Sequence, residues 1–67
     1  MTHRPTPNTA FLQARKSDTD SWGTLQRFRD LDRNKRFEKA HIALNHWLDN
    51  WQEAPAHAFR IVHGYEP

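Results

Sequence analysis

The strongest pattern in the sequence is an apolar stripe between residues 35 and 52. Its members recur every three or four positions, so they fall within an arc of about 120° when successive residues are rotated by about 100°. They are Phe37, Ala40, His41, Leu44, Trp47, Leu48 and Trp51. The pattern predicts an amphipathic helix from Lys35 to Gln52. Pro55 should end it, because proline lacks an amide and disfavours helical geometry in the residue before it.

A second, shorter helix is predicted before it. Residues 17–21 are Ser, Asp and Thr, whose side chains accept hydrogen bonds from the free amides of a helix start. Large apolar residues then recur every third position, at Trp22, Leu25, Phe28 and Leu31. Residues 32–34 interrupt this pattern with a turn, since Asn34 tolerates left-handed backbone geometry. The two helices would form a hairpin.

The ends of the chain carry weaker patterns. Residues 1–8 contain two prolines and should be a flexible tail. Residues 9–16 fit neither a helical nor a strand period, and both remain open. Residues 58–65 are rich in β-branched and aromatic side chains and should be extended. The expected fold is therefore mainly α: residues 9–67 form one small helical-hairpin domain with extended N- and C-terminal segments. If residues 9–15 are also extended, the two segments pair in a β-α-α-β arrangement.

Length and composition limit the core. A chain of 67 residues without cysteine has no disulfide to support it, and chains of this size bury only about 60% of their unfolded surface. Three Trp, four Phe and one Tyr supply most of the available apolar area. We expect a minimal core built from rings and completed by a second copy or a partner.

The chain offers no segment for a membrane. Its apolar runs are only a few residues long, as in Ala10-Phe11-Leu12, whereas a membrane-spanning helix needs about 20. The polar, proline-containing start is unlike a secretory signal. We expect a cytoplasmic protein.

Motifs for metal binding and catalysis are incomplete. The runs beginning at Asp18 and Asp30 resemble calcium loops but lack the glutamate required at position 12. Glu38 and His41 have the spacing of one half of a di-metal motif, which needs a second copy and further glutamates. The five histidines are scattered, and Ser17 and Ser21 have no associated base. We therefore expect no metal, no cofactor and no enzymatic activity.

Charge is distributed unevenly. Residues 1–39 hold nine Lys or Arg against five acids, whereas residues 40–67 hold one against three. Basic residues concentrate around the predicted inter-helix turn, a pattern typical of nucleic-acid binding; they are Arg27, Arg29, Arg33, Lys35, Arg36 and Lys39. The competing interpretation is a pair of solvated helix faces with weak ion pairs.

Two known ways of binding DNA fit parts of this pattern. A helix-turn-helix would require residues 9–16 to be helical. A ribbon-helix-helix dimer would use those residues as an intermolecular strand, with Gln13 and Arg15 facing the bases. No specific motif favours either one.

The function expected first is a non-enzymatic binding protein that acts through protein-protein contacts, as an accessory subunit or an inhibitor-type modulator. Its partner would be a larger protein or a second copy, because interfaces are enriched in large aromatic residues. The candidate interface residues are Trp22, Ile42, His46, Trp47, Trp51, Phe59 and Tyr65. The alternative is a small basic regulatory protein that binds nucleic acid through the basic turn.

Overall fold

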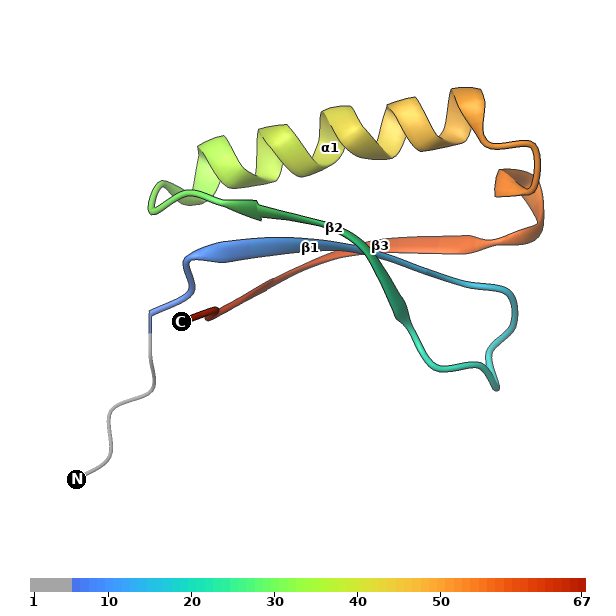
Figure 1. Cartoon of the computed structure of the whole chain (residues 1–67), viewed down its shortest axis with the longest axis horizontal. Coiled ribbons are helices and arrows are strands. Elements are labelled where there is room, and N and C mark those ends of the chain that lie inside the picture. The colour runs from blue at the N-terminus through green and yellow to red at the C-terminus, as the bar shows by residue number, and fades with distance from the viewer. Residues whose placement is uncertain (1–5) are drawn as a thin grey trace.

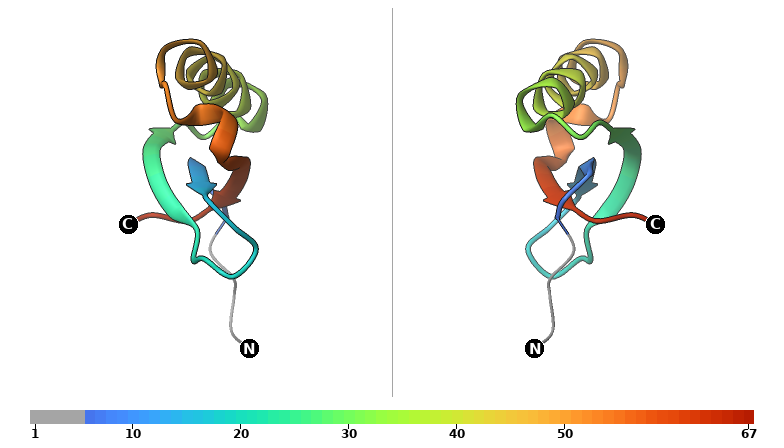
Figure 2. Two further views of the ribbon diagram at one scale, coloured as in Figure 1. Left: turned by 90° about the vertical axis from the view of Figure 1, so that its right-hand side faces the viewer. Right: turned by 90° about the vertical axis from the view of Figure 1, so that its left-hand side faces the viewer.

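A computed structural model describes residues 6–67 as a three-stranded antiparallel sheet with one helix packed on it (Figure 1). In chain order the elements are β1 (Thr9–Arg15), β2 (Gly23–Arg29), α1 (Arg33–Asn50), a 3-10 turn η1 (Ala54–Ala56) and β3 (Ala58–Gly64). The strand order is β2-β1-β3, so the first strand is the central one. End-on views place α1 along one face of the sheet, and within the described part of the chain no helix covers the other face (Figure 2).

The mainly α prediction is therefore wrong, because the segment expected to be the first helix is strand β2. It pairs with β1 along its length, from Thr9 opposite Arg29 to Ala14 opposite Gly23. The three-residue spacing that suggested a helix does not define one buried face: Phe28 is half-buried, whereas Leu31 is 87% exposed. Pairing with β1 supplies hydrogen-bond partners for the backbone groups on one side of this segment without a helix.

Residues 17–20 form the turn between β1 and β2 instead of the start of a helix. The Asp20 side chain accepts a hydrogen bond from the Ser17 amide at 3.1 Å, and the Asp20 amide donates to the Ser17 carbonyl at 3.1 Å. The same hydrogen-bonding ability serves turns and helix starts equally. The local sequence therefore could not separate the two outcomes.

Helix α1 is the element that the sequence predicts best, although its bounds differ by two residues at each end. It begins after Asp32, whose side-chain oxygen accepts hydrogen bonds from the amides of Asn34 at 2.8 Å and Lys35 at 3.2 Å. Its buried face is rotated from the predicted stripe, because Arg36 and Ala40 are buried while Phe37 is 47% exposed. The small Ala40 leaves room for close contact with the sheet.

The core lies between α1 and alternate residues of β1. Side chains on a strand alternate between the two faces of a sheet, and Ala10, Leu12 and Ala14 are 0%, 0% and 8% exposed. Leu12 is paired with Gln26 on one side and Ile61 on the other, which places it at the centre of the sheet. The extended C-terminal segment expected from the sequence is β3, and it pairs with β1.

The predicted tail, residues 1–8, lies mostly outside the described residues. Of its described part, Asn8 donates a side-chain hydrogen bond to the Glu66 carbonyl and accepts one from the Glu66 amide, both at 2.8 Å. In residues 6–67 no helix is long and apolar enough to cross a membrane.

Replacing Leu12 should destabilise the whole domain. Leu12→Ala removes the largest fully buried apolar side chain, which costs about 2–5 kcal/mol in comparable cores, and a domain of this size has about 3–5 kcal/mol in total. We expect the urea unfolding transition to be shifted strongly or lost. Leu31→Ala, the same change at an exposed position, should alter the free energy of unfolding by less than about 0.5 kcal/mol. Equal effects of the two changes would contradict this placement of the core.

Candidate functional site

The sheet face that α1 does not cover carries every arginine of the strands. Thr9, Phe11, Gln13 and Arg15 of β1 alternate with Ala10, Leu12 and Ala14, which face α1. These four residues and their partners on β2 and β3 therefore lie on the uncovered face. The strands contain four arginines and no Lys, Asp or Glu, and all four lie on this side: Arg15, Arg27, Arg29 and Arg60. We call this side the open face.

Two aromatic rings lie on the open face with these arginines. The guanidinium carbons of Arg15 and Arg60 are 4.4 and 4.3 Å from the centroid of the Trp22 ring, within cation-π range. The Phe11 ring lies against β3 at Gly64, where a Cβ atom would be 3.1 Å from Phe11 Cε2. Both rings are half-buried, so part of each remains accessible.

Gln13 holds the centre of the open face in place. Its side-chain Nε2 donates to Thr24 Oγ1 at 3.1 Å, and its side-chain Oε1 accepts from Arg60 Nε at 2.7 Å. These bonds join all three strands and fix the Arg60 guanidinium beside Trp22. The arginine is thereby positioned before any ligand arrives.

One acidic residue partly neutralises the opposite end of the open face. Arg27 Nε is 3.0 Å from Glu66 Oε2, and the Arg29 guanidinium donates to the Glu66 carbonyl. At the hairpin, Asp18 lies 3.6 Å from Arg15. The Arg27–Glu66 pair is exposed, and in the other pair Asp18 is exposed while the Arg15 side chain is 24% exposed. Pairs this open to solvent contribute little to stability, so a phosphate can compete with these carboxylates for the arginines.

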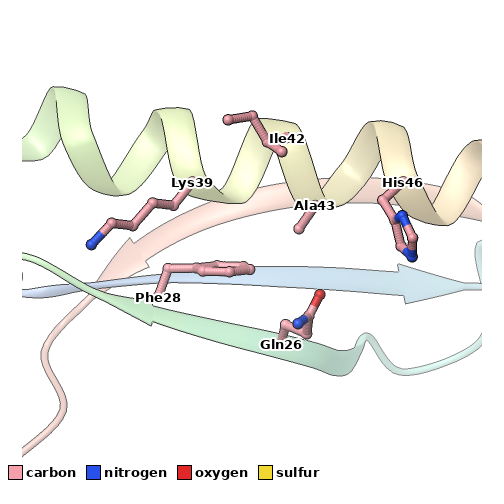
Figure 3. A pocket seen from close by; sticks show the side chains of 6 residues that line it. All are labelled: Gln26, Phe28, Lys39, Ile42, Ala43 and His46. Atoms are coloured by element: carbon pink, nitrogen blue, oxygen red, sulfur yellow. The ribbon is translucent and has the colours of Figure 1, made fainter.

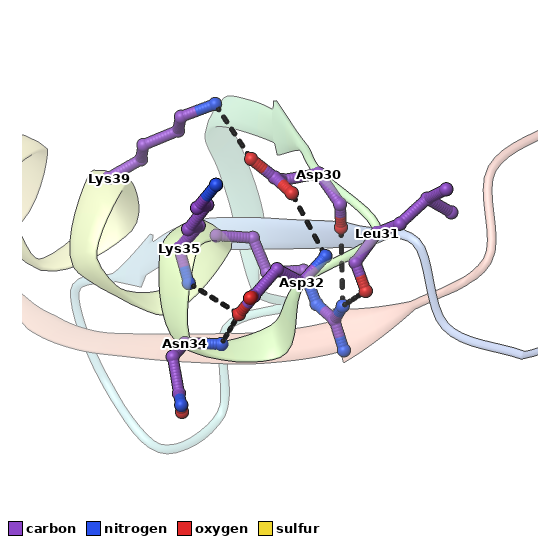
Figure 4. A network of polar contacts seen from close by, with 7 residues as sticks. Asp30, Leu31, Asp32, Asn34, Lys35 and Lys39 are labelled. Carbon is purple, nitrogen blue, oxygen red and sulfur yellow. Dashed lines mark hydrogen bonds and ion pairs between the residues drawn. The ribbon is translucent and has the colours of Figure 1, made fainter.

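The six residues predicted to bind nucleic acid do not form one patch. Arg27 and Arg29 are on the open face, while Arg33 and Lys35 are exposed at the start of α1. Lys39 pairs with Asp30 at 3.2 Å (Figure 4), and Arg36 is 4% exposed. The predicted basic inter-helix turn is not formed, because α1 is the one α-helix in residues 6–67 and residues 23–29 are strand β2.

Arg36 has a structural role. It donates to His63 Nδ1 at 2.9 Å and to the carbonyls of Asp30 and Leu31 at 3.2 and 3.3 Å, which ties the start of α1 to β3 and to the loop that follows β2. The pKa of Asp30 is lowered by the hydrogen bond from the Asp32 amide and by Lys39. This cluster, unlike the open face, has its polar groups paired within the chain.

The residues predicted as a protein interface fall into separate places. Trp22 is on the open face. Trp47, Trp51 and Phe59 pack together under the end of α1, with ring centroids 5.5 and 6.1 Å apart in successive edge-on contacts. Trp47 also donates to the Gln26 side chain at 3.0 Å. Tyr65 is 52% exposed beyond β3.

A cavity of about 180 Å³ lies at the end of α1 and is lined by His46, Trp47, Asn50 and Trp51.

Ile42 and His46 line a wider groove between α1 and the edge strand β2. Its volume is about 540 Å³, and its lining residues are Gln26, Phe28, Lys39, Ile42, Ala43 and His46 (Figure 3). Ile42 is 61% exposed. We call this the α1–β2 groove.

Phe11 and Arg60 are not among the site residues predicted from the sequence, and Arg15 is predicted only within the ribbon-helix-helix alternative. The sequence signal that could have found this face is the spacing of Arg27 and Arg29, which are two residues apart and therefore lie on one face if the segment is a strand. The signal is useful only if residues 23–29 are recognised as a strand. Among residues 6–67 no group of three or more His, Cys, Asp or Glu side chains is placed to hold a metal ion.

Comparison with known proteins adds nothing to this geometry: no family model, no curated protein and no solved structure matches the chain.

The Arg36–His63 contact should make stability depend on pH. Burial, followed by the charges of Arg36 and Arg33, lowers the pKa of His63 below its usual 6.5. The unfolded chain therefore protonates this histidine at a higher pH than the folded chain does. Stability should be fully present above about pH 6.5 and decline as the pH falls toward the lowered pKa.

Urea unfolding at a series of pH values measures this effect. His63→Gln should reduce the decline, whereas His46→Gln, on the exposed side of α1, should leave it in place. A decline of the same size in both variants would show that other groups are responsible.

Proposed function

We propose that this protein is a non-enzymatic, cytoplasmic protein that binds nucleic acid through the open face of its sheet. The observation that carries the proposal is that all charged side chains of the three strands are arginines on the same face. Arginine presents a rigid fork of donors that matches the geometry of phosphate. Phosphate contacts supply most of the affinity in non-specific complexes with nucleic acid.

The charge of the open face favours a polyanion over a second copy of the same face. Four arginines, Glu66 and Asp18 leave it with a net charge of about +2. Packing two such faces together would bring like charges into contact and desolvate them, which costs several kcal/mol. A polyanion would instead release its counterions and meet the arginines directly.

Removing two arginines of β2 should weaken binding. Arg27→Gln with Arg29→Gln leaves two of the four arginines, and Arg27 has a side chain that is 59% exposed. With each bound phosphate contributing about 0.7 to 0.9 to the slope of log affinity against log salt, the slope should be near 3 in magnitude and fall by about 1.5 in the variant. Fluorescence anisotropy with labelled single-stranded and duplex oligonucleotides over a range of salt measures both quantities.

A matched control removes the same charge elsewhere. Arg33→Gln with Lys35→Gln affects two exposed residues at the start of α1, and it should leave the salt slope nearly unchanged. Glu66→Gln should increase affinity, because it removes the acid beside Arg27. Equal losses in the two double variants would indicate general attraction to a positive molecule, and no complex with any oligonucleotide at low salt would refute the proposal.

The α1–β2 groove supports a second candidate function, contact with another protein, for which we propose a second copy as the partner. In residues 6–67 β2 has a strand neighbour on one side only, and an unprotected edge strand is a template for further pairing. A second β2 added there would extend the sheet. It would also cover Ile42, which is exposed beside this edge.

Charging the groove should prevent this self-association. Ile42→Glu is expected to shift the protein from dimer to monomer in sedimentation equilibrium, because an unpaired carboxylate would be buried at the contact. Leu48→Glu is the control, since Leu48 is 48% exposed on α1 but does not line the groove. A wild-type protein that remains monomeric at high concentration would exclude this candidate.

A further inference from the structure

The Phe11 ring lies across the open face instead of standing away from it. An ideal Cβ at Gly64 would lie 3.1 Å from Phe11 Cε2 and 3.8 Å from Cδ2, so the ring occupies the space that a side chain at this position would fill. Glycine at position 64 therefore allows the ring to rest against the backbone of β3. The ring is left as a partly accessible apolar surface among arginines.

The Trp22 ring is held at the other end of β1. Two guanidinium groups lie within 4.4 Å of its centroid, and Arg60 is itself fixed by Gln13. Arg15 Nε is the one buried side-chain nitrogen or oxygen in residues 6–67 that lacks a hydrogen-bond partner. Leaving the Arg15 Nε donor unsatisfied costs stability. The Trp22 ring, which the two arginines already hold in position, would lose little conformational freedom when a ligand binds.

Two aromatic rings among four arginines constitute the combination by which proteins bind unpaired nucleotides. Bases stack on aromatic rings regardless of sequence, while basic side chains follow the backbone. From this arrangement, and resting on the proposed function, we infer that the ligand of the open face is single-stranded nucleic acid. Its bases stack on Phe11 and Trp22, and its phosphates contact Arg27, Arg29, Arg15 and Arg60.

A duplex fits this surface less well. Its bases are already stacked on one another and cannot reach a ring that rests on the sheet. The major groove is about 12 Å wide and admits a helix or a two-stranded ribbon. The axes of the outer strands of a three-stranded sheet are already about 10 Å apart, and the arginine side chains add to this width.

The spacing of the rings sets a minimum ligand length. Phe11 and Arg15, which lies beside Trp22, are four residues apart on β1, or about 13 Å at the usual rise of a strand. Two adjacent stacked bases are separated by only about 3.4 Å. A dinucleotide therefore reaches one ring, and a strand must contain several nucleotides to engage both.

An oligonucleotide without bases separates stacking from charge. The probes are a ten-residue oligothymidylate, an abasic strand with the same number of phosphates, and a ten-base-pair duplex, each titrated into the full chain at one fixed salt concentration. Stacking on a protein ring is worth about tenfold in affinity or more for each base. With two rings, we expect the oligothymidylate to bind about a hundredfold more tightly than the abasic strand, and at least about tenfold more tightly than the duplex.

Substitutions then assign the effect to the two rings. Phe11→Leu and Trp22→Leu should each reduce the preference for oligothymidylate over the abasic strand by about tenfold. Phe37→Leu is the matched control, because Phe37 is on α1 and contacts His41 and His63 instead of the open face. Circular dichroism of each variant reports whether the fold is retained. The comparison of oligothymidylate with the abasic strand uses the unaltered protein, so it tests base stacking even if a variant fails to fold.

The outcomes distinguish this inference from the function on which it rests. Equal affinity for the abasic and oligothymidylate strands, or tighter binding of the duplex, would overturn the single-strand assignment while leaving nucleic-acid binding in place. Loss of all binding in the intact protein would overturn both. A strong preference for oligothymidylate that survives in Phe11→Leu and Trp22→Leu would refute the role of these rings.

Discussion

The pairing of β1 with strands on both of its sides is the constraint on which the rest of the structure depends. Because this strand is central, its alternate residues determine what each face of the sheet becomes. Ala10, Leu12 and Ala14 make one face apolar and small enough for α1 to pack on it. Phe11, Gln13 and Arg15 are thereby placed on the opposite face, which has no helix over it (Figure 2). The core and the candidate site are two consequences of one alternating segment.

The arginines of the chain serve two distinct purposes. Arg36 is buried and uses its donors to join α1 to β3 and to the loop that follows β2. Of the strand arginines, Arg27 forms an exposed ion pair with Glu66, and Arg15, whose side chain is 24% exposed, forms one with the exposed Asp18. A buried guanidinium must be satisfied within the fold to avoid a large desolvation cost, whereas an exposed one remains available to a ligand. Burial therefore separates structural from candidate binding residues better than charge does.

The three tryptophans are likewise divided. Trp47 and Trp51 close the end of the core, where they contact each other and Trp51 also contacts His57 and Phe59. Trp22 lies outside the core and is held by two arginines. The three tryptophans therefore do not form a single apolar surface. The two proposals follow this division: the open face depends on Trp22, whereas the α1–β2 groove depends on the uncovered side of α1.

The sequence by itself determined the helix over most of residues 33–50 and the extended segment after Pro55, because an apolar period and a proline act through local geometry. It also determined that basic residues exceed acidic ones in the first half of the chain. Only the tertiary structure decided that residues 23–29 form a strand, since hydrogen bonds to β1 outweigh the weak three-residue period. That decision moved Arg27 and Arg29 from an expected turn to a sheet face shared with Arg15 and Arg60. Residues from three separate strands become neighbours only through long-range pairing, which no local pattern specifies.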